Sequence, residues 1–139
     1  MTGFEIFWPI VAHVFLVFCL YALLSFRRMG LVRAGKANAG QFRENRDEPG
    51  ESLVVKNSIA NQFELPVLFY VLVILAIVTR QADLLFVAMS WIFVALRVLH
   101  AYIMVTTNFV PRRFQIHFVA LVVLVLMWII FAFRILVNV

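Results

Sequence analysis

The stretch that decides the fold is residues 59–105, IANQFELPVLFYVLVILAIVTRQADLLFVAMSWIFVALRVLHAYIMV. It contains two apolar runs, residues 59–79 and 84–105. Each is close to the roughly 20 residues that a helix needs to cross about 30 Å of hydrocarbon. Only the short segment 80–83 separates the two runs. A connection this short predicts an antiparallel pair of helices inside a membrane.

Two further apolar runs of similar length flank this pair, at residues 4–26 and 114–137. Hydrophobic residues make up 65% of the 139-residue chain, whereas soluble domains are about 45–50% apolar. The sequence therefore predicts an all-α integral membrane protein. We expect one four-helix bundle forming a single domain over residues 1–139, with a loop at 27–56 that contains a short interfacial helix near 37–46.

Basic residues predict the orientation of the bundle. Most of the 12 Lys and Arg residues lie in the loop 27–56, and Arg112 and Arg113 precede the last run. Connections rich in Lys and Arg face the cytoplasm, which places both chain termini on the opposite side of the membrane. The net charge of +5 favours anionic lipid as a partner and gives no indication of nucleic-acid binding.

Two charged residues, Glu64 and Arg97, interrupt the paired apolar runs. A charge near the bilayer centre costs roughly 2.5–3.5 kcal/mol on insertion scales, so such residues usually face a partner or a water-filled cavity. A rise of about 1.5 Å per residue places Glu64 about 12 Å and Arg97 about 15 Å from the cytoplasmic ends of their helices. These matching depths predict an ion pair between them.

Neighbouring polar residues extend the predicted pair into two facing rows. Asn57, Asn61 and Glu64 share one helical face, and Arg97 shares a face with His100. Structural pairing alone could account for both rows. However, hydrogen bonds between membrane helices contribute only about 0.6 kcal/mol on average, so the four adjacent groups of Asn61, Glu64, Arg97 and His100 favour a ligand site. Both interpretations stay open at this stage.

A proline and two further histidines also bear on the predicted site. Pro66 has no N–H for the Gln62 carbonyl and should kink the second span. His117 lies one turn after Arg113 on the same face, so it could join the same cavity. We otherwise expect His13 and His117 to be hydrogen-bonded structural groups. The His and Cys residues have no spacing typical of a metal site.

Three short motifs point to a known family. They are NQFELP at residues 61–66, RVLH at 97–100 and TTNFVPRRF at 106–114. At these positions the chain resembles the MAPEG family, the membrane-associated proteins in eicosanoid and glutathione metabolism, and especially its bacterial members. The resemblance extends over the whole chain in length, number of spans and charge topology.

The resemblance implies a homotrimer with active sites between neighbouring protomers near the cytoplasmic side, here of a bacterial inner membrane. It implies glutathione as cofactor, and lipophilic electrophiles or hydroperoxides as substrates that enter from the bilayer. Arg113 would stabilise the thiolate. The implied glutathione-binding residues are Asn57, Asn61, Glu64, Arg97 and His100. Asn57 stands where enzymatic members usually carry arginine, and Met104 stands where a tyrosine is often found.

Three functions are compatible with this sequence. The first is a glutathione-dependent transferase or peroxidase, which should bind glutathione and conjugate a model electrophile. The second is a non-catalytic lipid-binding or substrate-presenting protein that keeps the same fold, and its bound lipid should not depend on Arg113. The third is an accessory subunit of a larger membrane complex, which co-purification would reveal.

Overall fold

The computed structural model describes residues 4–138, and within that range every regular element is a helix. The helices are α1 (Phe7–Arg33), α2 (Ala39–Glu44), α3 (Gly50–Gln62), α4 (Leu65–Val78), α5 (Leu84–Val105) and α6 (Val110–Val137). Four segments are long and apolar enough to cross a membrane: α1, α3 with α4 (Gly50–Val78), α5 and α6. The predicted all-α fold with four membrane spans is confirmed.

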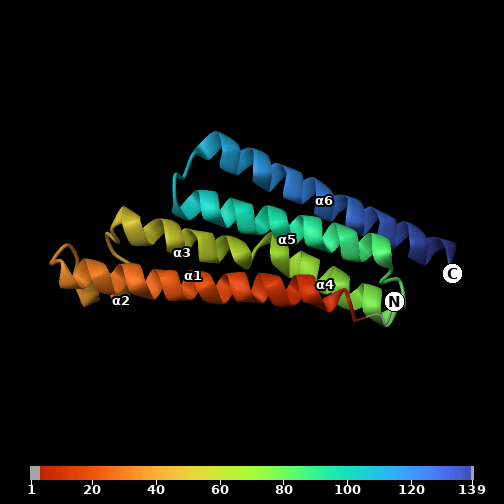
Figure 1. Cartoon of the computed structure of the whole chain (residues 1–139), viewed down its shortest axis with the longest axis horizontal. Helices are drawn as coiled ribbons and strands as arrows, with labels where there is room; N and C mark the ends of the chain where they lie inside the picture. The colour runs from red at the N-terminus through yellow and green to blue at the C-terminus, as the bar shows by residue number, and fades with distance from the viewer. Residues whose placement is uncertain (1–3, 139) are drawn as a thin grey trace.

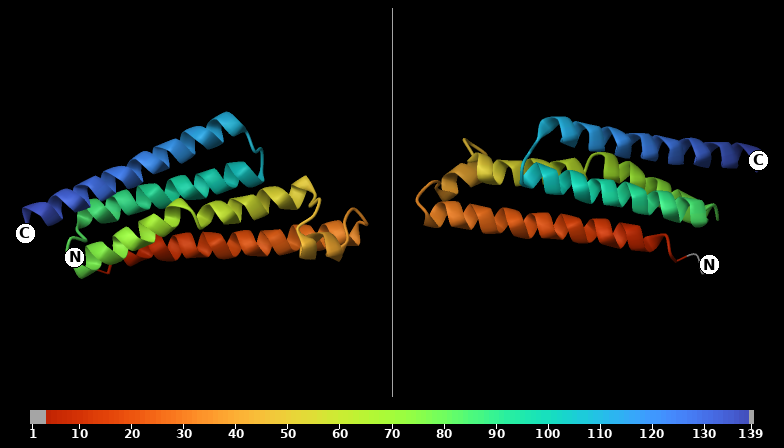
Figure 2. Two further views of the ribbon diagram at one scale, coloured as in Figure 1. Left: turned by 180° about the vertical axis from the view of Figure 1, so that it is seen from behind. Right: turned by 45° about the horizontal axis from the view of Figure 1, so that its top comes forward.

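The four spans lie side by side, with α3 and α4 following each other as one interrupted rod (Figure 1). The helix α6 packs mainly on α5, and α1 packs on α3 and α5 (Figure 2). Both chain ends lie at one end of the bundle, together with the turn between α4 and α5. The α1–α3 and α5–α6 connections point to the opposite end, which carries Arg27, Arg28, Arg112 and Arg113 and is called the basic end below.

The helices at the basic end are longer than the sequence predicted. The helix α1 continues to Arg33 instead of ending near residue 26, and α3 begins at Gly50 instead of near residue 59. The predicted loop over residues 27–56 is therefore wrong in its limits, although α2 does fall within the interval 37–46 expected for a short helix. Polar residues had suggested a loop, but here they form the first and last turns of helices.

Specific contacts explain why α1 extends so far. Arg27 donates hydrogen bonds of 2.8 Å to the Glu51 carbonyl and of 2.8 Å to the Val105 carbonyl, which joins α1 to α3 and α5. Arg28 forms a two-pronged ion pair with the Glu48 carboxylate, at 2.7 and 3.1 Å. Bidentate arginine–carboxylate pairs fix geometry as well as adding energy. The last turns of α1 are thus held against the bundle.

The second span breaks at Phe63 and Glu64, so α3 and α4 are separate helices. The cause is Pro66, because it lacks the N–H that would bond to the Gln62 carbonyl in a continuous helix. His13 of α1 braces both sides of the break. Its Nε2 donates to Gln62 Oε1 at 2.9 Å, and its Nδ1 accepts a hydrogen bond from the Tyr70 hydroxyl. The predicted kink is therefore a full interruption.

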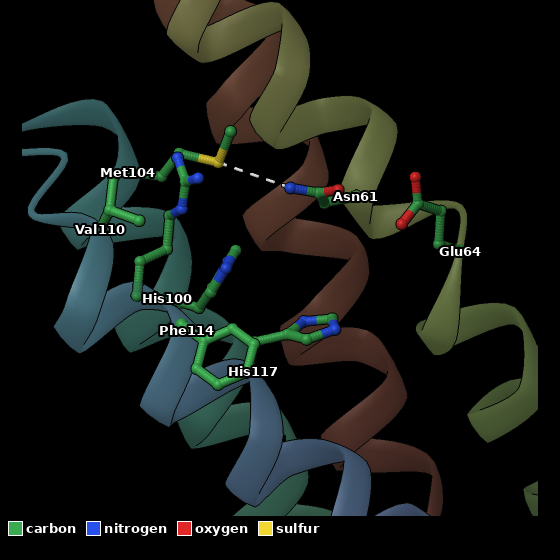
Figure 3. A pocket seen from close by; sticks show the side chains of 8 residues that line it. Asn61, Glu64, His100, Met104, Val110, Phe114 and His117 are labelled. Carbon is green, nitrogen blue, oxygen red and sulfur yellow. Dashed lines mark hydrogen bonds between the residues drawn. The ribbon is translucent and has the colours of Figure 1, made fainter.

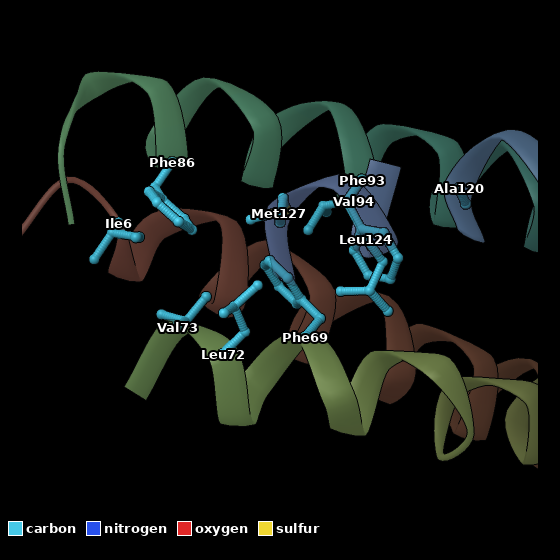
Figure 4. Close-up of a cluster of buried hydrophobic side chains, with 10 residues drawn as sticks. All are labelled: Ile6, Phe69, Leu72, Val73, Phe86, Phe93, Val94, Ala120, Leu124 and Met127. Carbon is cyan, nitrogen blue, oxygen red and sulfur yellow. The ribbon is translucent and has the colours of Figure 1, made fainter. Parts of the chain in front are cut away.

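Two apolar clusters leave room for a polar layer between them. The larger lies among α4, α5, α6 and the start of α1 (Figure 4). It comprises Ile6, Phe69, Leu72, Val73, Phe86, Phe93, Val94, Ala120, Leu124 and Met127. The smaller joins α1, α3 and α5 towards the basic end and comprises Leu20, Leu24, Val55, Ile59 and Ala101. On α5, Arg97 and His100 fall between Val94 of the larger cluster and Ala101 of the smaller one. The polar residues therefore occupy the level where the two cores meet.

At the opposite end, Asp83 fastens the α4–α5 turn to α6. Its carboxylate accepts a hydrogen bond from the Phe86 N–H at 3.2 Å and pairs with Arg134 of α6 at 2.8 Å. Burial raises the pKa of the Asp83 carboxyl, but the Arg134 and Phe86 hydrogen bonds lower it by more, so its pKa lies below the usual value. The carboxylate is therefore charged over the ordinary pH range.

Candidate functional site

A cavity of about 250 Å³ lies between the end of α3, the middle of α5 and the start of α6 (Figure 3). Its lining residues are Asn61, Glu64, His100, Met104, Val110, Arg113, Phe114 and His117. They come from segments far apart in the sequence, which the break after α3 and the short α5–α6 connection bring to one level.

Most of the residues predicted for the site meet in this cavity. Asn61, Glu64, His100 and Arg113 all line it, and the expectation that His117 joins them is confirmed. Asn57 is exposed and lies outside the cavity lining. Arg97 is fully buried, with 0% of its surface exposed, so it stands behind the cavity wall.

The predicted ion pair between Glu64 and Arg97 is wrong. Within residues 4–138, Glu64 forms no ion pair, and its side chain is exposed. Glu64 has φ −95° and ψ −100°, outside the helical region, because it lies in the break before Pro66. The prediction assumed helical geometry up to Pro66, whereas the break at Glu64 leaves its carboxylate out of ion-pair distance of Arg97, although Glu64 still lines the cavity with Asn61. In Figure 3, Glu64 lies beyond Asn61, on the side away from Met104.

Arg97 instead joins three helices from behind the cavity. Its Nη2 donates to the Asn61 carbonyl at 3.1 Å, and its Nη1 lies 3.3 Å from Nδ1 of His117. The Asn61 carbonyl belongs to the last turn of α3, where unpaired carbonyls carry partial negative charge that favours a cation. Within the break this carbonyl accepts only a long 3.4 Å backbone hydrogen bond, from the Glu64 N–H, and Arg97 is its second donor.

Arg113 reaches the cavity from the first turn of α6. Its Nη1 donates to Asn108 Oδ1 at 2.6 Å. Asn108 lies in the α5–α6 connection with φ +49°, in the left-handed region that asparagine tolerates better than most residues. Sequence reasoning included Asn108 in a motif but gave it no role. Its side chain holds the guanidinium of Arg113 at the rim of the cavity.

The cavity has a polar side and an apolar side. Asn61 Nδ2 donates to Met104 Sδ at 3.5 Å across the cavity, a weak hydrogen bond because sulfur is a poor acceptor. Val110 and Phe114 form the apolar side, and Phe114 is 67% exposed. Sequence reasoning missed both residues, although their positions next to Arg113 in the same helical turn could have indicated them. Such a lining suits a ligand with a polar head that meets an apolar reactant.

The model of the MAPEG family matches residues 6–133 of this chain, nearly its whole length. The chain belongs to the MAPEG family. It is therefore a multi-pass integral membrane protein of the family named for eicosanoid and glutathione metabolism. A search of curated proteins and a search of solved structures each gave no match.

In this MAPEG protein, the cavity brings together a guanidinium, two imidazole rings and a carboxylate. Arg113 supplies a positive charge and His100 and His117 supply imidazole rings whose centroids lie 5.6 Å apart. Glu64 supplies a carboxylate at the opposite edge. A cation at one edge and an anion at the other can orient a zwitterionic molecule between them.

Proposed function

We propose that this MAPEG protein, acting as one four-helix membrane domain, binds glutathione in the cavity and activates its thiol. The thiolate would attack lipophilic electrophiles or hydroperoxides, as in a transferase or peroxidase. The observation that carries the proposal is that the cavity joins the guanidinium of Arg113 to the polar groups of Asn61 and Glu64 and to an apolar wall at Val110 and Phe114.

The role proposed for Arg113 follows from thiol chemistry. A free thiol has a pKa near 8.5, and the thiolate is the nucleophile, so ionisation at neutral pH requires nearby positive charge or hydrogen-bond donors. Arg113 is the cavity-lining guanidinium, and Asn108 fixes its position. We assign it the stabilisation of the thiolate. Asn61 and Glu64 would then bind the peptide and amino groups of glutathione, with His100 beside them.

The family resemblance implied that Asn57 and Arg97 bind glutathione directly. Neither residue lines the cavity, so the proposal gives neither of them a direct contact within one protomer. Asn57 lies outside the cavity lining of one protomer, so it is no longer a direct ligand there. Arg97 is fully buried and acts through the residues that it holds, Asn61 and His117.

Two features support a site that a neighbouring protomer completes. The cavity volume of about 250 Å³ lies below the range of roughly 300–1,000 Å³ that is usual for ligand pockets. Glu64 is an exposed carboxylate within a span, and such groups usually find a partner. We therefore propose a homotrimer in a bacterial inner membrane, with the cavity on the cytoplasmic side and closed by the adjacent copy.

In the conjugation reaction, the proton of the thiol passes to solvent when the sulfur binds beside Arg113. The thiolate then forms a bond to the electrophilic carbon while the bond to the leaving group breaks, and the leaving group departs with the electron pair. The lipophilic substrate would reach the sulfur along Val110 and Phe114, which border the cavity.

The test compares Arg113→Ala with Arg112→Ala in protein purified in detergent. Arg112 is its exposed neighbour and does not line the cavity. We expect the wild type and Arg112→Ala to bind glutathione and to conjugate a chloronitrobenzene. Arg113→Ala should lose roughly a hundredfold in kcat/KM, as removal of one electrostatic donor does in other enzymes. Absence of glutathione binding to the wild type at millimolar concentration would refute the proposal.

A second candidate function is supported by the exposed apolar wall. Val110 and Phe114 are 56% and 67% exposed beside a polar cavity, a combination that also suits the head and first methylenes of a lipid. In that case, lipid would co-purify with the protein, and Arg113→Ala would not change the amount bound.

A further inference from the structure

The contact between Arg97 and His117 fixes the proton of His117. A guanidinium has only donors, so at the 3.3 Å contact Nη1 of Arg97 donates and Nδ1 of His117 accepts. A ring nitrogen that accepts carries no proton. The neutral imidazole must then carry its proton on Nε2, since one nitrogen of a neutral ring is a donor and the other an acceptor.

The Nε2 side of the His117 ring faces the cavity. His117 lines the cavity one turn after Arg113, on the same face of α6. Arg97, which takes Nδ1, is fully buried behind the wall. Within residues 4–138, no group accepts a hydrogen bond from Nε2. In Figure 3 the imidazole projects from α6 between Phe114 and Glu64. The Nε2–H is thus a donor without a protein partner at a site where a ligand would bind.

The other two histidines do not share this arrangement. Both ring nitrogens of His13 are hydrogen-bonded, to Gln62 and Tyr70, so neither nitrogen is available to a ligand. His100 is only 3% exposed, and its Nδ1 has no partner within the described chain, so no contact selects its tautomer. His117 alone among the three described histidines combines a fixed tautomer with a place in the cavity and a free donor.

We propose that His117 is a ligand-binding residue of this site and that its Nε2–H donates a hydrogen bond to the glutathione sulfur beside Arg113. Arg97 is the positioning residue that holds His117 in this tautomer. This inference rests on the proposed function, since it assumes that the thiolate lies at Arg113. It supplies a second donor to the sulfur, and a neutral one, which stabilises the anion without adding another charge to the membrane interior.

The first measurement does not depend on glutathione. Nitrogen-15 NMR of labelled histidine in the detergent-solubilised wild type should show His117 as the Nε2–H tautomer. The His117 resonances are assigned as the set of signals that is absent from the spectrum of His117→Gln. A His117 ring that carries its proton on Nδ1, or that exchanges between both tautomers, would overturn the inference even if the protein binds glutathione.

The second measurement compares three variants. His117→Phe keeps a ring but removes the donor, His117→Gln keeps an N–H near the position of Nε2, and Gln115→Ala alters an exposed residue of the same helix outside the cavity. Ultraviolet absorbance gives the thiolate fraction of bound glutathione across pH. We expect the ratio of thiolate to thiol to fall about tenfold in His117→Phe, to recover largely in His117→Gln, and to stay at the wild-type value in Gln115→Ala.

The outcomes separate the two proposals. If the wild type ionises bound glutathione and His117→Phe does so equally well, the role of His117 is refuted while the proposed function stands. If the wild type binds no glutathione, the proposed function fails, and the role of His117 toward the sulfur fails with it. If His117→Phe does not fold, His117→Gln still decides the question, because loss of ionisation in a folded variant that keeps the donor would contradict our assignment.

Discussion

Asn108 offers the sharpest test of how the structure places Arg113. This residue does two separable things: its backbone adopts φ +49°, and its Oδ1 accepts a 2.6 Å hydrogen bond from Arg113. Asn108→Gly keeps the backbone conformation, because glycine adopts positive φ without steric cost, and removes only the acceptor. Asn108→Asp keeps an acceptor oxygen and tolerates the same conformation.

The expected magnitude follows from the burial of the pair. Hydrogen bonds to charged groups contribute about 1.5–3 kcal/mol, and both Asn108 and Arg113 are half-buried, so we take the lower end. About 1.5 kcal/mol corresponds to roughly tenfold in rate. Asn108→Gly should therefore lose about tenfold in glutathione-dependent kcat/KM while its melting temperature stays near that of the wild type. Asn108→Asp should keep the position of Arg113 and a wild-type melting temperature but should also lose activity, because its carboxylate opposes the thiolate.

Steady-state kinetics with a chloronitrobenzene, together with thermal melts in the same detergent, measure both effects. A third variant, Asn108→Ala, serves as the control for the backbone. It should melt at a lower temperature, because a non-glycine residue without a polar side chain costs roughly 1–2 kcal/mol in the left-handed region. If Asn108→Gly has wild-type activity while Arg113→Ala is inactive, the position of Arg113 does not depend on Asn108 and our reasoning is wrong.

Two further predictions concern stability. His13→Phe should lower the free energy of unfolding by about 1–3 kcal/mol for the buried Gln62 side chain left unsatisfied, and by less for the half-buried Tyr70. A melt as stable as that of the wild type would contradict a brace across the helix break. The Asp83–Arg134 pair should contribute to stability above the pKa of an unfolded aspartate, about 4, and lose that contribution as the pH falls through the lower pKa of the folded state. Melting temperatures measured from pH 6 down to pH 2 should therefore fall less steeply in Arg134→Gln than in the wild type.

The sequence was sufficient to predict the four spans and their pairing. Apolar runs of the right length, a turn of a few residues at 80–83 and two basic connections determine the number, direction and order of the helices. The limits at the basic end were missed because hydropathy marks where a helix leaves the hydrocarbon and carries no information on where it ends. Arg33 and Gly50 lie beyond the apolar runs but still belong to helices whose polar turns pack against one another.

The candidate site was predicted in part, and the errors have one cause. Asn61, His100 and Arg113 meet because their positions depend only on the register of separate helices. Glu64 was misplaced because its predicted face assumed uninterrupted helical geometry up to Pro66. The proline was visible in the sequence, but the size of the distortion it causes depends on which tertiary contacts support the break. Those contacts are made by residues distant in the chain: Arg97 donates to the Asn61 carbonyl, and His13 donates to the Gln62 side chain.

The break supplies one of the two partners of the buried Arg97 guanidinium, whose Nε has no partner within the described chain. A charge in an apolar interior is strongly unfavourable unless its donors are satisfied. Because the helix stops at Gln62, the Asn61 carbonyl has only a long 3.4 Å backbone partner, the Glu64 N–H, and it also accepts from Nη2, while Nη1 contacts His117. Pro66 interrupts the second span, and Arg97 binds a carbonyl at this interruption. The same guanidinium contacts His117 of α6 and so orients a residue that lines the cavity.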